Sequence, residues 1–179
     1  MSEITEESLV LQAIDGSHEA FAGLYDRHFN KVYRYVYFKV TSKSEAEDIT
    51  QEVFLKALGA IGNYKPRQVP FTAWLFRIAH NEVVDYYRSR SKKETVQLNE
   101  NVAYTTVDPV AIAEHTVDME SVNKAILKLT PAQREVITLR FAAEMSIAEV
   151  AGTLKKSEGT IKALQFTATV SLRKLLMNK

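Results

Sequence analysis

Apolar residues recur with the period of an α-helix along two long stretches in the first half of the chain, and this pattern limits the fold more than any other feature. The first stretch is marked by Phe21, Leu24, Tyr25, His28, Val32 and Val36, and the second by Ala46, Ile49, Val53, Ala57 and Ile61. Ser44, followed three residues later by Glu47, predicts a capping box at the start of the second helix. No stretch alternates with the period of a half-buried strand, so the sequence predicts an all-α protein.

Helix-start signals are repeated three times near the C-terminal end. They are Thr130 with Pro131 and Gln133, Ser146 with Glu149, and Ser157. The last two signals begin helices that are joined by only about three residues, which is typical of a helix-turn-helix. A plain helical hairpin would give the same spacing, but the basic character of this part of the chain favours a module that binds DNA.

A segment without helical period separates the two helical parts. Residues 95–116 mix β-branched and polar side chains with one proline, so they predict a connector. Residues 1–98 hold thirteen basic and thirteen acidic side chains, residues 99–120 hold none and five, and residues 121–179 hold ten and four. The net charge of +1 therefore hides an acidic connector and a basic second module. We predict a first domain over residues 1–94, a flexible acidic linker over 95–118 and a second domain over 119–179.

Enzymatic chemistry is not indicated. The chain has no cysteine, which excludes disulfides, thiol nucleophiles and thiolate metal sites, and the four histidines lack the spacing of a metal site. The sequence also has no glycine-rich phosphate loop and no G-x-S-x-G motif. We therefore expect neither an enzyme nor a bound metal or cofactor. An acidic N-terminus and the absence of a long apolar run predict a cytoplasmic protein that is not inserted in a membrane.

The stretch FTAWLFRIAHNEVVDYYRSR (residues 71–90) combines side chains that suit unpaired nucleic-acid bases. On a helix, Trp74, Arg77, Asn81 and Arg88 share one narrow stripe, with Val84 and Asp85 at its edges. The preceding loop adds Tyr64, Lys65, Arg67 and Phe71. Together these residues offer stacking, hydrogen bonding to base edges and phosphate contacts. The alternative, a core tryptophan among solvated arginines, stays open at this point.

Two further faces have a functional and a plain interpretation. Opposite the apolar stripe of the second helix lie Asp48, Gln51, Glu52 and Leu55, which are either a solvated face or a docking face for a basic protein. On the last helix, Lys162 and Arg173 could neutralise phosphates, while Phe166 could contact thymine methyl groups. Glu158 could accept a hydrogen bond from a cytosine amine or serve only the helix dipole.

The order of these parts resembles the extracytoplasmic-function (ECF) sigma factors, the subunits that direct bacterial RNA polymerase to promoters. AEDITQEVFLKAL (46–58) is similar to the polymerase-binding helix of the family, and WLFRIAHNEVVDYYRSR (74–90) to the helix that melts and reads the minus-ten element. LTPAQREVITLRF and SIAEVAGTLKKSEGTIKALQ resemble the domain that reads the minus-thirty-five element. The resemblance spans nearly the whole chain.

The resemblance assigns roles to particular residues. It implies that Asp48, Gln51, Glu52 and Leu55 dock on the clamp coiled coil of the polymerase, and that the second domain meets the polymerase flap. It implies that Asn81, Asp85 and Arg88 contact the melted strand, and that the loop of residues 63–72, with Tyr64 and Phe71 as candidate lining, captures a flipped-out base. In the helix-turn-helix the DNA-binding candidates are Lys156, Ser157, Glu158, Thr160, Lys162, Phe166 and Arg173. An anti-sigma factor is an expected partner.

The chain departs from the family at two places. His80 stands where relatives commonly have arginine, and Phe166 and Thr167 stand where the recognition helix tends to be basic. A sigma factor is the first interpretation. A sigma-like protein that binds polymerase without reading promoters, and a stand-alone helix-turn-helix regulator, are the alternatives.

Overall fold

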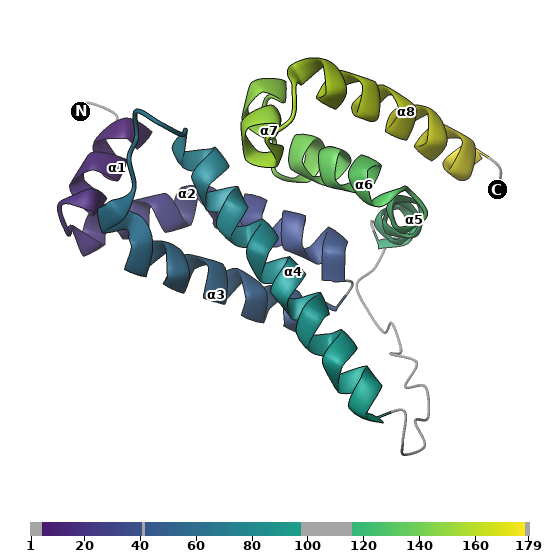
Figure 1. The fold of residues 1–179 in the computed structure, drawn as a ribbon, viewed down its shortest axis with the longest axis horizontal. Helices are drawn as coiled ribbons and strands as arrows, with labels where there is room; N and C mark the ends of the chain where they lie inside the picture. The colour runs from purple at the N-terminus through teal and green to yellow at the C-terminus, as the bar shows by residue number, and fades with distance from the viewer. Residues whose placement is uncertain (1–4, 41, 98–115, 178–179) are drawn as a thin grey trace.

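The computed structural model describes residues 5–40, 42–97 and 116–177, and within these ranges all regular structure is helical, which confirms the predicted fold class (Figure 1). The first module contains α1 (Glu6–Ile14), α2 (His18–Val40), α3 (Lys43–Ala60), the 3₁₀ turn η1 (Ile61–Asn63) and α4 (Phe71–Gln97). The second contains α5 (Thr116–Leu127), α6 (Pro131–Ile137), the π-helical turn η2 (Thr138–Ala142), α7 (Ile147–Leu154) and α8 (Glu158–Met177). Residues 98–115 of the predicted linker lie outside the described residues, whereas its ends, 95–97 and 116–118, belong to α4 and α5.

The first module is built around α2, which packs against α1, α3 and α4. Most residues that the helical period marked are buried, among them Leu24, Val36 and Val53, whereas Tyr25 and Ile49 are partly buried. Phe76 of α4 is fully buried and meets Tyr35 of α2 edge to face, with ring centroids 5.4 Å apart. This core holds α3 and α4 so that each turns one polar face outward.

Helix α3 begins two residues earlier than the sequence indicated. Its N-cap is Ser42, whose extended backbone lets the side-chain oxygen accept a hydrogen bond from the N–H of Glu45. Ser44 lies inside the first turn, so the predicted capping box of Ser44 and Glu47 is wrong. An N-cap needs a non-helical backbone, and the chain leaves the helical conformation at Ser42 rather than at Ser44.

The caps of the second module are confirmed. Thr130 and Gln133 form a capping box with Pro131 at the first position of α6, and Ser146 and Glu149 form another at the start of α7. Lys155 takes a left-handed conformation (φ 54°) that ends α7, and three residues, 155–157, separate α7 from α8. The pair α7 and α8 is therefore the predicted helix-turn-helix.

Removing the cap of α7 should destabilise the second module measurably. In Ser146→Ala the N–H of Glu149 loses its hydrogen-bond acceptor, the Ser146 hydroxyl at 3.2 Å. The reciprocal bond of the capping box, from the N–H of residue 146 to the Glu149 carboxylate, is then no longer supported by it. We expect a loss of about 1 kcal/mol in the free energy of unfolding, measured by urea titration. Ser44→Ala is the control, because Ser44 is exposed inside a helix and its replacement should cost nothing measurable. Equal midpoints for the two variants would contradict the assignment.

The two modules pack against each other. α4 lies on α7, and α2 lies on η2 and α5 (Figure 1). A single apolar cluster runs through both modules and joins Tyr35 and Phe76 of the first to Val136, Met145 and Val150 of the second. Over the described ranges, no helix has the length and apolar character needed to cross a membrane.

Candidate polymerase and nucleic-acid interfaces

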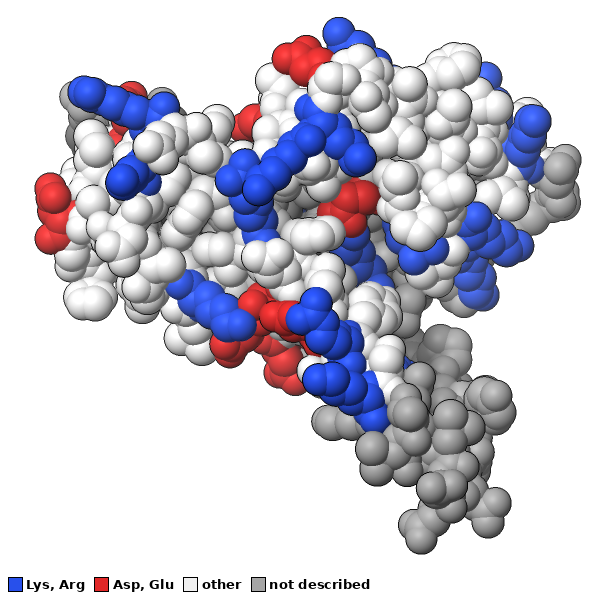
Figure 2. Space-filling view, in the orientation of Figure 1, with Lys and Arg blue, Asp and Glu red and all other residues white. Residues whose placement is uncertain are grey.

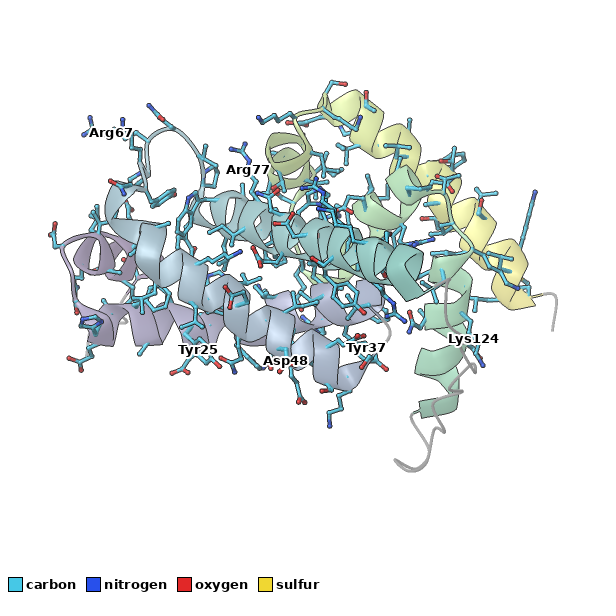
Figure 3. All side chains as sticks on the ribbon, turned by 60° about the horizontal axis from the view of Figure 1, so that its bottom comes forward. Tyr25, Tyr37, Asp48, Arg67, Arg77 and Lys124 are labelled. Atoms are coloured by element: carbon cyan, nitrogen blue, oxygen red, sulfur yellow. The ribbon has the colours of Figure 1, made fainter. Side chains whose placement is uncertain are left out.

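An acidic face with one apolar residue lies on the outer side of α3. Asp48, Gln51 and Glu52 are exposed, and Leu55 is 63% exposed, although leucine side chains are normally buried. Figure 3 shows Asp48 and Tyr25 on the same side of the first module. The Nε2 of Gln51 donates to the Tyr25 hydroxyl at 3.3 Å, which ties this face to α2. Negative charge therefore surrounds an apolar side chain. This face is complementary to a protein surface that is basic and has an apolar residue at its centre.

Aromatic residues of α2 flank this face and were not predicted as part of it. Tyr25, Phe29, Tyr33 and Tyr37 follow one another at four-residue spacing and are partly buried. The rings of Phe29 and Tyr33 stack at 6.2 Å, and those of Tyr33 and Tyr37 at 6.0 Å. The spacing was visible in the sequence, but it is equally typical of an ordinary core stripe.

The predicted loop between α3 and α4 divides into buried and exposed residues. Tyr64 and Phe71 are only 7% and 6% exposed, and the Tyr64 hydroxyl donates to the carbonyl of Val69. Both rings pack on Trp74, with centroids 4.9 and 5.7 Å away, so they support the loop from beneath rather than face solvent. Burial raises the pKa of Tyr64.

The charged residues of the loop lie on its surface. Lys65 and Arg67 are exposed, and Figure 3 shows Arg67 at the loop, away from the helices. In this arrangement the loop therefore presents cations, while the aromatic residues expected to line a base pocket belong to the core.

The stripe on α4 is split into two parts. Asn81, Asp85 and Arg88 are exposed, and Nη1 of Arg88 lies 3.4 Å from Oδ1 of Asp85. Lys and Arg side chains follow the C-terminal half of α4 in Figure 2. The exposed part of the helix, from Asn81 onward, can offer an amide and cations to a nucleic-acid strand.

The other part of the stripe faces the second module. Nη2 of Arg77 donates to the backbone carbonyl of Gly152 in α7 at 2.8 Å, and Nδ1 of His80 lies 3.1 Å from Oε1 of Glu135 in α6. These contacts join residues 75 and 55 positions apart, and no local pattern in the sequence indicated them.

The carboxylate of Glu135 in α6 is contacted by three side chains of the first module. Its carboxylate, 13% exposed, accepts hydrogen bonds from the Tyr35 hydroxyl at 2.6 Å and from the ammonium of Lys39, in addition to the contact with His80. Burial on its own raises the pKa of Glu135. The hydrogen bonds from the three donors and the positive charge of Lys39 outweigh burial and lower the pKa to about 2.

The DNA-binding candidates of the helix-turn-helix are exposed to solvent. The exposed residues are Lys156, Ser157, Glu158, Thr160, Lys162, Phe166 and Arg173. Ser157 accepts from the N–H of Thr160 at 3.1 Å, so it starts α8 as predicted. Phe166 is 71% exposed, whereas the hydroxyl of Thr167 accepts from Nε2 of Gln133 at 3.2 Å and so contributes to the packing of α8 on α6. Among the described residues, no cluster of three or more His, Cys, Asp or Glu could hold a metal ion.

Comparison with known proteins identifies both modules. The family model "Sigma-70 region 2" matches residues 24–93, and "Sigma-70, region 4" matches residues 125–174. The ECF RNA polymerase sigma factor SigW of Bacillus subtilis (strain 168) is 32% identical over 186 residues, which cover 97% of this chain and 98% of the relative. The chain belongs to the ECF RNA polymerase sigma factors. It is therefore related to DNA-binding transcription factors and not to enzymes.

Other relatives agree with this assignment. The sigma factor is 38% identical over 170 residues to the ECF RNA polymerase sigma factor BldN of Streptomyces coelicolor. That match covers 94% of this chain and 64% of BldN, so the sigma factor spans just under two thirds of the length of BldN. Its fold matches that of CnrH, solved in complex with the cytosolic domain of CnrY, with a TM-score of 0.74, 27% identity and 96% of each chain covered.

A further solved structure supports the fold of the sigma factor. RpoE from Bartonella quintana, solved with the anti-sigma factor NepR, matches with a TM-score of 0.73 at 23% identity, covering 89% of this chain and 98% of RpoE. The region 2 match ends in α4 and the region 4 match begins in α5, so both lie inside the predicted domains. The predicted limits of 1–94, 95–118 and 119–179 stay a prediction, and α4 continues three residues beyond the first of them.

Proposed function

We propose that this sigma factor binds core RNA polymerase in the cytoplasm, directs it to a specific set of promoters and opens the DNA at the minus-ten element. The observation that carries the proposal is the exposed set of Asn81, Asp85 and Arg88 on α4, in the region 2 module of a chain that also has a region 4 helix-turn-helix. The polymerase performs the chemistry, and the sigma factor supplies docking and DNA recognition.

The exposed part of α4 has the chemistry to hold a melted strand. The amide of Asn81 can both donate to and accept from a base edge, which Lys or Arg cannot do. Arg88 of α4 and the loop residues Lys65 and Arg67 are exposed cations that can contact phosphates. Asp85 holds Arg88 in place through its contact at 3.4 Å.

The helix-turn-helix is proposed to bind the minus-thirty-five element as duplex DNA. Lys156 lies in the turn before α8, Lys162 in the first part of α8 and Arg173 further along it, so these exposed cations suit phosphates on either side of a groove. The exposed Phe166 suits the methyl group of a thymine, and Glu158 suits a cytosine amine. Thr160 and Ser157 keep the helix start in shape through the hydrogen bond between their hydroxyls at 2.9 Å.

The protein partners follow from the charged and apolar surfaces. We propose that Asp48, Gln51, Glu52 and Leu55 dock on the clamp coiled coil of the polymerase and that the second module contacts its flap. An anti-sigma factor is a further proposed partner, supported by the structure of the related RpoE, which contains one.

The test is run-off transcription by purified bacterial core polymerase on a promoter library. We expect specific transcripts with the sigma factor, and a loss of about 5-fold to 150-fold in Asn81→Ala, because one base contact of this kind is worth about 1–3 kcal/mol. Asn30→Ala is the matched control, since Asn30 is an exposed asparagine of α2 outside the proposed interface and its variant should transcribe normally.

The same experiment distinguishes transcription initiation from a second candidate function. Phe166 and Thr167 stand where the recognition helix of the family tends to be basic, and these residues would permit a sigma-like protein that binds polymerase without reading promoters. Tight binding to core polymerase with no transcript from any promoter would overturn the initiation proposal and leave that alternative.

A further inference from the structure

The loop between η1 and α4 rests on a cluster of packed rings, and one of these rings belongs to a histidine of α2. Phe71, at the end of the loop, packs on Tyr64 and Trp74 and also meets His28 edge to face, with ring centroids 5.3 Å apart. We call the rings of His28, Tyr64, Phe71 and Trp74 the loop cluster. His28 is only 4% exposed, so it supports the loop from beneath and does not itself reach the surface that would meet DNA.

Helix α1 supplies a polar contact that orients the His28 ring. Oε2 of Glu6 lies 2.9 Å from Nε2 of His28. Because a carboxylate can only accept, the ring must carry a proton on Nε2 and donate it. Nδ1, on the other side of the ring, is buried and has no hydrogen-bond partner in the part of the chain that the structure describes. The orientation of this ring within the loop cluster therefore depends on Glu6.

The carboxylate of Glu6 also acts on the loop cluster through its charge. The hydrogen bond from His28 lowers the pKa of Glu6 more than burial raises it, so the carboxylate is ionised at neutral pH and is a strong acceptor. Burial raises the pKa of Tyr64, and the negative charge of Glu6 raises it further. Glu6 is therefore close enough to the loop to influence a ring of the loop directly.

Helix α1 contacts the start of the loop as well. It packs against η1, which leads into the loop, and Figure 1 shows α1 beside the segment that joins η1 to α4. The approach of α1 to α2 is close, since a Cβ atom on Gly23 would meet the Leu9 side chain at 3.2 Å. A helix that carries none of the proposed polymerase or nucleic-acid contacts therefore braces both ends of the loop.

We propose that Glu6 and His28 are positioning residues for promoter opening. Glu6 orients the His28 ring, and this ring holds Phe71 at the end of the loop. The loop then presents its exposed cations, Lys65 and Arg67, to the melted strand. The inference rests on the proposed function for its role in transcription, whereas the support of the loop can be measured on the free protein.

The first measurement follows the loop cluster without polymerase. Trp74 is the only tryptophan of the chain and its ring lies 5.7 Å from that of Phe71, so its fluorescence reports on the cluster. Glu6→Ala and His28→Ala should each increase the quenching of this fluorescence by acrylamide, because the loop opens more often. Glu6→Gln keeps an acceptor for Nε2 and should behave like the unchanged protein. Glu7→Ala is the matched control, since it removes the same charge from an exposed position of the same helical turn.

The second measurement is the rate of promoter opening by core polymerase with each protein. It uses a promoter found in the run-off library, with 2-aminopurine placed in the minus-ten element. At saturating polymerase, Glu6→Ala and His28→Ala should open duplex DNA about tenfold more slowly, the effect of losing one hydrogen bond to a charged group. The half-saturating concentration should not change, because neither residue contacts DNA or polymerase. On a template already mismatched over the minus-ten element the defect should be much smaller, whereas a general loss of folded protein would affect both templates equally.

Three results would contradict the inference. They are unchanged quenching in both Glu6→Ala and His28→Ala, an unchanged opening rate despite increased quenching, and equal losses on the duplex and the mismatched template. If the unchanged protein gave no transcript from any promoter, the proposed function would fail instead. The quenching of Trp74 would then still decide whether Glu6 and His28 position the loop.

Discussion

Reversing the charge of Asp48 and Glu52 together is expected to reduce the affinity for core RNA polymerase by a hundredfold or more. Both carboxylates are exposed on α3 beside Leu55, and the proposed partner surface is basic. Asp48→Lys with Glu52→Lys would place like charges opposite each other, which costs several kcal/mol at an interface. The measurement is a binding titration of core polymerase with each protein, followed by run-off transcription.

The neighbouring Glu47 provides the control for charge alone. Glu47 is also exposed on α3, but it lies about 100° around the helix from Asp48. Glu47→Lys should bind core polymerase within a few-fold of the unchanged protein, and Asp48→Lys alone should already be clearly weaker. If the double variant bound as tightly as Glu47→Lys, the docking face would have to be elsewhere. A stand-alone regulator would show no dependence on this face at all.

The elements that the sequence predicted are those whose signals are local. α2 and α3 have long apolar stripes, and α6, α7 and α8 begin at capping residues that the structure confirms. α1 was not predicted, because it buries only Leu9, Val10 and Ala13, although Thr5 caps it through the N–H of Ser8 at 3.2 Å. α5 was also missed, because its first residues, 116–118, fall inside the segment interpreted as a linker.

The sequence predicted many of the residues of the candidate site, but not which of them would be buried or which would contact one another. Tyr64 and Phe71 are the clearest case, because an aromatic residue in a loop can either face a ligand or anchor the loop, and local sequence does not distinguish the two. Here they anchor it on Trp74. The contacts of Glu135 are the opposite case: Glu135 lies between two capping signals and has no pattern of its own, because its partners Tyr35 and His80 are 100 and 55 residues away.

The stability of the protein between pH 7 and pH 3 is expected to depend on Glu135. The pKa of this carboxyl is about 2 in the structure, below its ordinary value of 4.5, so the folded protein holds the proton less strongly than the unfolded chain does. A lowered pKa contributes stability that is fully present above about pH 4.5 and is lost as the pH falls toward 2. The difference of about 2.5 pH units corresponds to roughly 3 kcal/mol, of which about 2 kcal/mol is lost between pH 7 and pH 3.

Glu135→Gln should therefore be less stable at pH 7 and should lose less stability on acidification than the unchanged protein. Urea titrations at pH 7 and pH 3, followed by circular dichroism, give both quantities for each protein. Glu144→Gln is the control, because its exposed carboxylate pairs across the same interface and its pKa is also lowered by Arg34 and Lys31, but water screens that contact. The Glu144→Gln variant should keep most of the pH dependence of the free energy of unfolding. Equal acid dependence in Glu135→Gln and the unchanged protein would mean that Glu135 is already solvated, and that the modules are not held together by this carboxylate.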